Sequence, residues 1–277
     1  MMLSMHTRPQ RRIFRGLRLL LALAAVAAAS VCAKPVAHSS SPPTYRLKVV
    51  RSYPHDPNAF TQGLIFLDGK LYESTGLYGR SSVRRVDLAS GTVEQESKLP
   101  AAFFGEGLAR VGQQLFQLTW KDGKVLVWDL TTLKKENEFS YDGEGWGLCF
   151  NGRHLVMSDG TDRLIWRSPV SFSKEGEIRV RRAGRPLSNL NELECIGDAV
   201  FANVWQDSHI ARIDGKTGEV TAWIDASGLL APEEATRADV LNGIAEMPNT
   251  GHLLVTGKLW PRLYEVEMVS TAKAGAR

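Results

Sequence analysis

The sequence predicts an all-β protein, and three observations support this. Short apolar runs alternate with Gly, Asp and Asn turn residues from residue 45 onward, which is typical of strands. A five-residue pattern recurs, and its middle residues are 44, 40, 45 and 51 positions apart. Further apolar runs follow each copy in the same order. Such a repeat is typical of sheets arranged in a ring, so we predict a five-bladed β-propeller.

The copies of the pattern differ mainly at their middle position. Glycine fills the fourth position in most copies (Gly63, Gly107, Gly147 and Gly243), which suits close approach of backbones at a narrow axis. A packing position would stay apolar, but the middle position is polar or aromatic: Gln62, Glu106, Trp146, Asn191 and Asn242. The first strand of each blade lines the central channel, so we expect a ring of these side chains at its mouth.

The runs after each copy predict the remaining strands. Second strands are expected at residues 70–74, 114–118, 154–158, 199–203 and 252–256. Third strands are expected at 82–88, 124–130, 163–168, 209–214 and 262–268, and fourth strands at 92–99, 134–141, 178–183 and 219–224. The last unit lacks a fourth strand, so the strand at 45–52 should complete it and close the ring. Helix is expected only at about residues 231–238.

The ends of the second strands predict another ring near the same mouth: Thr75, Trp120, Asp159, Trp205 and Lys258. One carboxylate, several amides, a lysine and three tryptophans would form a pocket for a small polar group with an aromatic enclosure. No nucleophile elbow, phosphate-binding loop or dinucleotide fingerprint competes with this interpretation. His55 and Asp56 lie in a proline-flanked turn and are expected to stabilise it, while Glu192 should support the ring.

The amino terminus predicts export. Residues 1–33 contain five arginines, no acidic residue and a short apolar run at 19–29, which is typical of a signal peptide cleaved after about Ala33. Arg11 and Arg12 also resemble a twin-arginine signal, so either Sec or twin-arginine export is open. We expect a Ser/Pro-rich linker at 34–44, the propeller at 45–268, a tail at 269–277, and a periplasmic or secreted protein without stable membrane insertion.

Charge and cysteine usage narrow the partners. After the leader, 29 basic and 30 acidic residues remain, so nucleic-acid binding loses its electrostatic support. We expect a monomer. Cys149 and Cys195 stand at different offsets from their copies of the pattern, which places them on opposite faces of their strands. We therefore predict two separate buried thiols, although export would permit a disulfide.

Eight segments in order resemble the plant and bacterial type of glutaminyl-peptide cyclotransferase. They are residues 60–64 (FTQGL), 72–82 (YESTGLYGRSS), 104–108 (FGEGL), 145–148 (GWGL), 158–160 (SDG), 190–194 (LNELE), 202–206 (ANVWQ) and 255–261 (VTGKLWP). The resemblance covers essentially residues 45–268 and implies a five-bladed propeller. It also implies conversion of the N-terminal glutamine of peptides or proteins to pyroglutamate, with release of ammonia.

The residues used by that family correspond to Phe60, Gln62, Phe104, Glu106, Trp120, Trp146, Asn191, Trp205 and Lys258. We expect Glu106 to act as general base and then general acid, and Lys258, with Gln62 or Asn191, to stabilise the oxyanion. The aromatic residues should hold the substrate, and repeat geometry adds Asn242 as a substrate contact. The resemblance implies no required metal or cofactor, although oxygen atoms in the channel could hold a structural calcium ion.

Two alternatives remain open at this stage. A calcium-dependent propeller hydrolase of the lactonase kind would use Glu106, Asn191 and Asn242 as ligands, but it leaves the tryptophans and Lys258 unexplained. A non-catalytic periplasmic propeller that binds peptides would need an exposed apolar rim, and it leaves the ring of polar residues unexplained.

Overall fold

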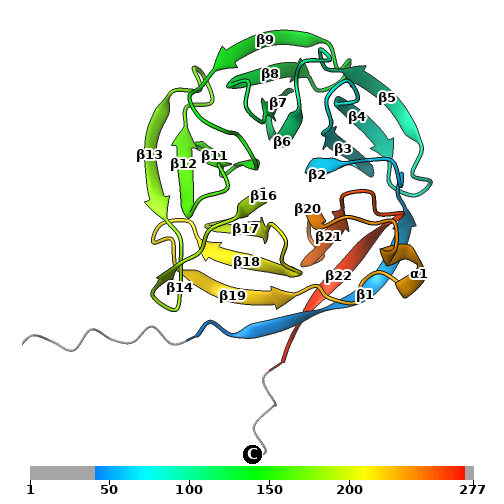
Figure 1. Ribbon diagram of the computed structural model, residues 1–277, viewed down its shortest axis with the longest axis vertical. Coiled ribbons are helices and arrows are strands. Elements are labelled where there is room, and N and C mark those ends of the chain that lie inside the picture. The colour runs from blue at the N-terminus through cyan, green and yellow to red at the C-terminus, as the bar shows by residue number, and fades with distance from the viewer. Residues whose placement is uncertain (1–40, 272–277) are drawn as a thin grey trace, which may run out of the picture. The chain divides into compact units, whose positions relative to one another are not determined.

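Residues 41–271, the part of the chain that the computed structural model describes, form an all-β fold with one short helix. The sheets surround a common centre (Figure 1). Each four-stranded sheet has its first strand innermost and its fourth at the periphery, and the eight-stranded sheet has both of its end strands innermost. The predicted signal peptide, most of the predicted linker and the end of the predicted tail lie outside the described residues. No helix within residues 41–271 has the length and apolar character needed to cross a bilayer.

Three sheets contain four antiparallel strands each, in chain order. The first has β2 (Thr61–Leu67), β3 (Lys70–Thr75), β4 (Ser82–Asp87) and β5 (Val93–Lys98). The second has β6 (Gly105–Val111), β7 (Gln114–Thr119), β8 (Lys124–Asp129) and β9 (Lys135–Ser140). The third has β10 (Leu148–Phe150), β11 (Leu155–Ser158), β12 (Arg163–Arg167) and β13 (Lys174–Arg179). The fourth strand of the third sheet, β13, therefore starts earlier than the predicted strand at 178–183. A short hairpin of β14 (Arg181–Arg182) and β15 (Arg185–Pro186) follows β13.

An eight-stranded sheet contains the remaining strands. They are β16 (Leu190–Ile196), β17 (Ala199–Val204), β18 (His209–Asp214), β19 (Val220–Asp225), β20 (Leu241–Met247), β21 (His252–Gly257), β22 (Arg262–Ser270) and β1 (Thr44–Pro54). As predicted, β1 pairs antiparallel with the last strand, β22. It also pairs parallel with β19, which was not predicted and which joins two of the expected units into one sheet. The helix α1 (Pro232–Ala235) precedes β20 and is shorter than expected.

The hydrophobic core consists of five clusters that lie between successive groups of strands. Leu108, Leu115 and Leu126 of the second sheet pack on Tyr72 and Val83 of the first. The same arrangement continues around the centre and ends where β20–β22 pack against the first sheet. Strands such as β3, β7 and β17 are buried along nearly their whole length, and successive side chains of a strand point to opposite faces, so these strands supply the two apolar faces that this arrangement needs.

Glycine allows neighbouring inner strands to touch at the centre, as the sequence predicted. A Cβ atom on Gly63 would lie 2.5 Å from the backbone nitrogen of Leu108 on β6. One on Gly107 would lie 2.6 Å from the carbonyl carbon of Gly147, beside β10, and one on Gly147 would lie 2.9 Å from the carbonyl carbon of Asn191 on β16. Any side chain at these positions would push the inner strands apart.

A disulfide bond joins Cys149 on β10 to Cys195 on β16, with Cα atoms 5.5 Å apart. The prediction of two separate thiols is therefore wrong. The two cysteines do face different sides of their own sheets, but β10 and β16 are neighbouring inner strands of adjacent sheets. Where two adjacent sheets pack together, one sheet contributes one of its faces and the other sheet contributes the opposite face. Cysteines on opposite faces of their own sheets can therefore meet in this interface and form a disulfide.

Replacing both cysteines, Cys149→Ser with Cys195→Ser, should lower the free energy of unfolding by roughly 4 kcal/mol. This is the value that the chain-entropy model gives for a loop of 46 residues. Denaturant unfolding of the oxidised parent, the reduced parent and the double variant measures the difference. The last two should agree, and a double variant as stable as the oxidised parent would show that packing alone holds β10 to β16.

A buried charged cluster attaches the turn before β2 to the first sheet. His55 Nδ1 lies 2.7 Å from the Trp260 carbonyl oxygen, and His55 Nε2 lies 3.1 Å from Glu73 Oε1. An ionised carboxylate and a carbonyl only accept hydrogen bonds, so His55 is held as an imidazolium. Glu73 also accepts from Thr61 Oγ1 at 2.6 Å and from Arg84 Nε at 2.8 Å. The turn that contains His55 is thus anchored by a network, beyond the local turn role that the sequence predicted.

Stability should fall as pH rises through the pKa of His55. Burial alone would lower the pKa of His55, but the Glu73 carboxylate and the Trp260 carbonyl raise it above its ordinary value. The contribution of the His55 charge to the free energy of unfolding is complete below the pKa of histidine in the unfolded chain, about 6.5. It is lost as pH rises through the higher pKa of His55 in the folded state. We expect the free energy of unfolding, measured by denaturant titration at several pH values, to fall more steeply in the parent than in His55→Gln. Equal pH dependence in both proteins would contradict the imidazolium.

Candidate active site

A cavity of about 260 Å³ opens at the centre, where β2, β6 and β16 begin and β7, β17 and β21 end. Its polar lining residues are Gln62, Glu106, Asn191 and Lys258. Its aromatic lining residues are Phe60, Phe104, Trp120, Trp146 and Trp205. All nine are site residues predicted from the sequence, and the fold brings them into one cavity. The cavity is smaller than the roughly 300–1,000 Å³ of sites for drug-sized ligands, so it suits a single amino-acid residue.

The Glu106 carboxyl group is buried near the start of β6 and lines the cavity. Gln62 Nε2 donates a hydrogen bond to Glu106 Oε1 at 2.9 Å, and no other group in residues 41–271 hydrogen-bonds to this side chain. Burial raises the pKa of Glu106 well above its ordinary value, with Glu144 adding to the effect and Lys258 opposing it. A carboxyl group with a raised pKa and an open oxygen is suited to taking up and returning a proton.

Lys258 places a buried ammonium group at the same cavity, from the turn after β21. Its Nζ atom lies 4.8 Å from the centre of the Phe60 ring, in a cation–π contact. Within the described part of the chain, this nitrogen has no hydrogen-bond acceptor and no ion pair. Burial lowers the pKa of Lys258, while the Glu106 and Asp239 carboxylates oppose that shift. An oxygen atom of a bound ligand would satisfy this donor.

Asn191 contributes a second polar group without a partner. Its backbone oxygen accepts a hydrogen bond from Ser158 Oγ at 2.7 Å, which fixes the start of β16. Its side-chain amide lines the cavity and has no hydrogen-bond partner in residues 41–271. Gln62 is instead engaged on both sides, because it donates to Glu106 and accepts from Asn242 Nδ2 at 3.2 Å. The cavity thus offers a ligand an ammonium, an amide and a carboxyl oxygen.

The aromatic walls contact one another edge to face. The Phe104 ring lies 6.0 Å from the Phe60 ring and 5.6 Å from the Trp120 ring, measured between centres. The rings of Trp146 and Trp205 are 5.7 Å apart and perpendicular. Trp205 is 37% exposed and therefore forms the rim of the cavity. Such contacts stabilise a fixed apolar enclosure.

Two residues that support these walls were not predicted from the sequence. Glu144 Oε2 accepts hydrogen bonds from Trp120 Nε1 at 2.8 Å and from Trp146 Nε1 at 3.1 Å. Glu144 stands at the first position of its copy of the pattern, where the first two copies have phenylalanine, and this exception was the available signal. Tyr78 packs on Phe104 with ring centres 5.4 Å apart, from the turn after β3, for which the repeat gave no signal.

Three residues of the predicted rings do not line this cavity. Asn242 is fully buried behind Gln62, to which it donates a hydrogen bond. Thr75, the last residue of β3, hydrogen-bonds to the first residue of β4. Asp159 forms an ion pair with Arg163. The repeat correctly places these residues at strand ends, but each side chain contacts another residue of the protein and does not line the cavity.

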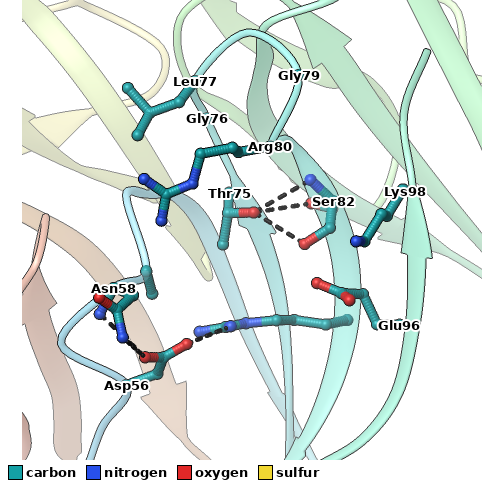
Figure 2. A pocket seen from close by; sticks show the side chains of 12 residues that line it. Asp56, Asn58, Thr75, Gly76, Leu77, Gly79, Arg80, Ser82, Glu96 and Lys98 are labelled. Atoms are coloured by element: carbon teal, nitrogen blue, oxygen red, sulfur yellow. Dashed lines mark hydrogen bonds and ion pairs between the residues drawn. The ribbon is translucent and has the colours of Figure 1, made fainter. Parts of the chain in front are cut away.

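Figure 2 shows a second, polar cavity of about 220 Å³, whose lining includes Asp56, Thr75 and Gly76. It lies beside the site, because a Cβ atom on Gly76 would meet the Phe104 ring of the first cavity. Several polar groups of its wall already have partners within the protein. Arg84 pairs with Asp56 at 2.8 Å, and Thr75 hydrogen-bonds to β4. It lacks both the aromatic enclosure and the unpaired buried groups of the first cavity, so we place the candidate site in the first.

A calcium ion does not fit the residues of the candidate site. Residues 41–271 contain no group of three or more His, Cys, Asp or Glu side chains arranged to hold a metal ion. The cavity has one carboxyl group, Glu106, whereas calcium takes about six to eight oxygen ligands.

Glu192 directs its carboxyl group to backbone amides, at 3.3 Å from the Leu64 nitrogen and 2.9 Å from the Ile244 nitrogen. It thereby holds β2 to β20, in agreement with its predicted supporting role.

Comparisons with known proteins give the family. The model of the glutamine cyclotransferase family matches residues 19–268. The glutaminyl-peptide cyclotransferase of Arabidopsis thaliana is 45% identical over 235 residues, which are 83% of this chain and 73% of that protein. The crystal structure of Myxococcus xanthus glutaminyl cyclase is similar with a TM-score of 0.75 and 40% identity, over 83% of this chain and 99% of that one. The resemblance inferred from the motifs is thus confirmed, and the chain belongs to the glutamine cyclotransferase family.

Proposed function

We propose that this protein converts the N-terminal glutamine of peptides and proteins to pyroglutamate and releases ammonia, with Glu106 as the proton carrier. The observation that carries the proposal is a set of groups in one aromatic cavity that have no hydrogen-bond partner within residues 41–271: Glu106 Oε2, the Lys258 ammonium and the Asn191 amide. An N-terminal glutamine presents the complementary groups, an amine that donates and a carboxamide oxygen that accepts. The activity named for the Arabidopsis and Myxococcus relatives supports the same reaction.

The same proposal includes the architecture and setting of the enzyme. Five hydrophobic clusters between successive groups of strands support a five-bladed propeller closed by β1. The predicted leader supports a periplasmic or secreted location, where peptides with an N-terminal glutamine would be the partners. The reaction proposed here needs only proton transfer and charge stabilisation, both of which the side chains supply.

Glu106 acts first as a base and then as an acid. The α-amine nitrogen of the substrate attacks the γ-carboxamide carbon, and a proton from that nitrogen passes to the Glu106 carboxylate. The bond from the carboxamide carbon to the amide nitrogen then breaks, and Glu106 returns the proton to the departing nitrogen as ammonia leaves. One carboxyl group serves both steps because its net protonation is unchanged after a turnover.

Lys258 and Asn191 stabilise the oxygen that becomes negative when the amine attacks. Both present donors to the cavity that have no acceptor within residues 41–271. Donors fixed in advance inside a buried site stabilise an oxyanion more strongly than water does, because they need no reorganisation. Gln62 is unsuited to this role, since Asn242 and Glu106 already occupy its amide.

The aromatic walls determine the shape of the bound substrate and exclude water. Ring closure requires the amine and the carboxamide carbon to approach in a folded conformation, which a cavity of about 260 Å³ favours. Water that reached the carboxamide carbon would give glutamate instead of pyroglutamate. Burial of the substrate amine also favours its neutral, nucleophilic form.

Glu106→Gln should lower kcat by roughly 10²–10⁴-fold, because an amide cannot take up the proton of the amine. Turnover is measured as ammonia release and as the mass loss of one ammonia from a peptide that begins with glutamine, with and without a chelator. The parent should be active in both conditions.

Glu136→Gln is the matched control, since Glu136 is an exposed glutamate on the peripheral strand β9, and it should keep parental activity. Full turnover by Glu106→Gln would remove Glu106 from the mechanism. Loss of parental turnover in chelator would instead favour a metal-dependent reaction.

Substitutions beside Glu106 should move the acid limb of the kcat/KM profile in opposite directions. Glu144 raises the pKa of Glu106, so Glu144→Gln should move the limb to lower pH. Lys258 lowers it, so Lys258→Met should move the limb to higher pH and also reduce kcat, by roughly 10²–10³-fold if its oxyanion contact is lost. Initial rates across the pH range measure both effects. Shifts of the same sign would show that the limb does not report Glu106.

A further inference from the structure

A run of hydrogen bonds links the backbone of β2 to the Glu106 carboxyl group. Asn242 Nδ2 donates to the Thr61 carbonyl oxygen at 2.9 Å and to Gln62 Oε1 at 3.2 Å. Gln62 Nε2 then donates to Glu106 Oε1 at 2.9 Å. All three side chains are more than nine-tenths buried, so bulk water does not compete for these bonds.

The Thr61 carbonyl oxygen sets the direction of every bond in this run. Because it only accepts, the Asn242 amide must present its nitrogen to it. The second hydrogen of that nitrogen reaches Gln62, which must therefore present its oxygen to Asn242 and its nitrogen to Glu106. A reversed Asn242 amide would place its oxygen against two acceptors. Asn242 Oδ1 is buried without a partner within residues 41–271, so no other contact there favours the reversed orientation.

We propose that Asn242 is a positioning residue that acts through Gln62: it keeps Glu106 Oε1 as a hydrogen-bond acceptor and leaves Oε2 to exchange the proton with the substrate. This inference rests on the proposed function for its kinetic consequences. The sequence predicted a direct substrate contact for Asn242, whereas the side chain lies one residue behind the cavity wall.

The consequence is a base with one defined working oxygen. A donor held against Oε1 favours the ionised carboxyl group and excludes a proton from that atom. The other titratable groups that shift the pKa of Glu106 are Lys258 after β21 and Glu144 in the loop between β9 and β10. The same loop carries Tyr141, whose own pKa is raised by burial and by the Glu106 charge. Within residues 41–271 none of them hydrogen-bonds to Oε1, so Gln62 decides its role.

Asn242→Asp tests this arrangement because it keeps the shape and replaces the donating nitrogen with an acceptor. Gln62 should then turn its nitrogen to the new carboxylate and its oxygen to Glu106, which favours the protonated form of Glu106. We expect kcat to fall by roughly tenfold or more, KM to change by less than about threefold, and the acid limb of the kcat profile to rise by about one pH unit.

The same substitution in a Gln62→Leu background separates two effects on Glu106. One is transmitted through the hydrogen bonds from Asn242 to Gln62 to Glu106, which we call the relay, and the other is direct charge repulsion. Leucine cuts the run, so adding Asn242→Asp should cause no further change in kcat or in the acid limb. A shift that persists in this background would mean that the added charge acts directly on Glu106 and would overturn the proposal.

Asn203→Asp is the matched control. Asn203 is equally buried near the centre, its Oδ1 accepts from the Gly243 nitrogen at 2.9 Å, and its Nδ2 has no partner within residues 41–271. Since it does not contact Gln62, its substitution should leave the acid limb in place. A limb that moves equally in Asn203→Asp and Asn242→Asp would contradict a specific role for Asn242.

A measurement without turnover keeps the two proposals distinct. The side-chain amide signals of Gln62 in proton–nitrogen NMR, assigned by their loss in Gln62→Leu, should shift as Glu106 ionises in the parent. A parent that shows this titration but cyclises no peptide would reject the proposed function and retain the relay. An active parent whose Gln62 signals ignore Glu106 would overturn the relay.

Asn242→Ala covers the case in which Asn242→Asp fails to fold. It removes the constraint on Gln62 without adding an acceptor, so kcat should fall less, and the acid limb should move in the same direction by a smaller amount. Parental kcat and an unmoved limb in Asn242→Ala would overturn the proposal.

Discussion

Close contact between the inner strands is the constraint on which the structure depends. Gly63, Gly107 and Gly147 each face the backbone of the next inner strand at distances that leave no space for a Cβ atom. This contact narrows the centre until side chains more than 40 residues apart in sequence line one cavity. Without it, Glu106 would face a wide, water-filled opening, and burial would no longer raise its pKa.

Two buried glutamates at the centre show what distinguishes a catalytic carboxyl group from a structural one. Burial raises the pKa of both Glu106 and Glu192 well above the ordinary value. Glu192, however, accepts two backbone hydrogen bonds, from Leu64 and Ile244, and thereby braces two strands. Within residues 41–271 the Glu106 carboxyl group accepts a single hydrogen bond, from Gln62, and this residue lines the cavity. Both glutamates have a raised pKa, so the pKa alone does not distinguish them. Glu106 is assigned the chemistry because it lines the cavity and has a carboxyl oxygen without a hydrogen-bond partner in the described residues.

The repeat pattern made much of the fold and site predictable, because one position per copy maps to one place at the centre. Seven of the nine cavity residues and the pairing of β1 with β22 follow from this logic, whereas Phe60 and Phe104 were expected only from the family resemblance. Contacts between sheets were not predictable in the same way. The Cys149–Cys195 bridge depends on which faces of two sheets meet, and the β1–β19 pairing depends on where the two segments pass each other. The roles of Glu144 and Asn242 depend on hydrogen-bond directions, which residue spacing does not encode.

The most direct test of this account is the ionisation of Glu106 in the substrate-free enzyme. Carbon NMR of protein labelled at the glutamate carboxyl carbon, with Glu106→Gln to assign the signal, gives its pKa. The account predicts ionisation well above the ordinary value for glutamate, about 4.3. Ionisation at or below that value in an active enzyme would mean that burial does not prepare this carboxyl group, and the assignment of Glu106 as the proton carrier would fail.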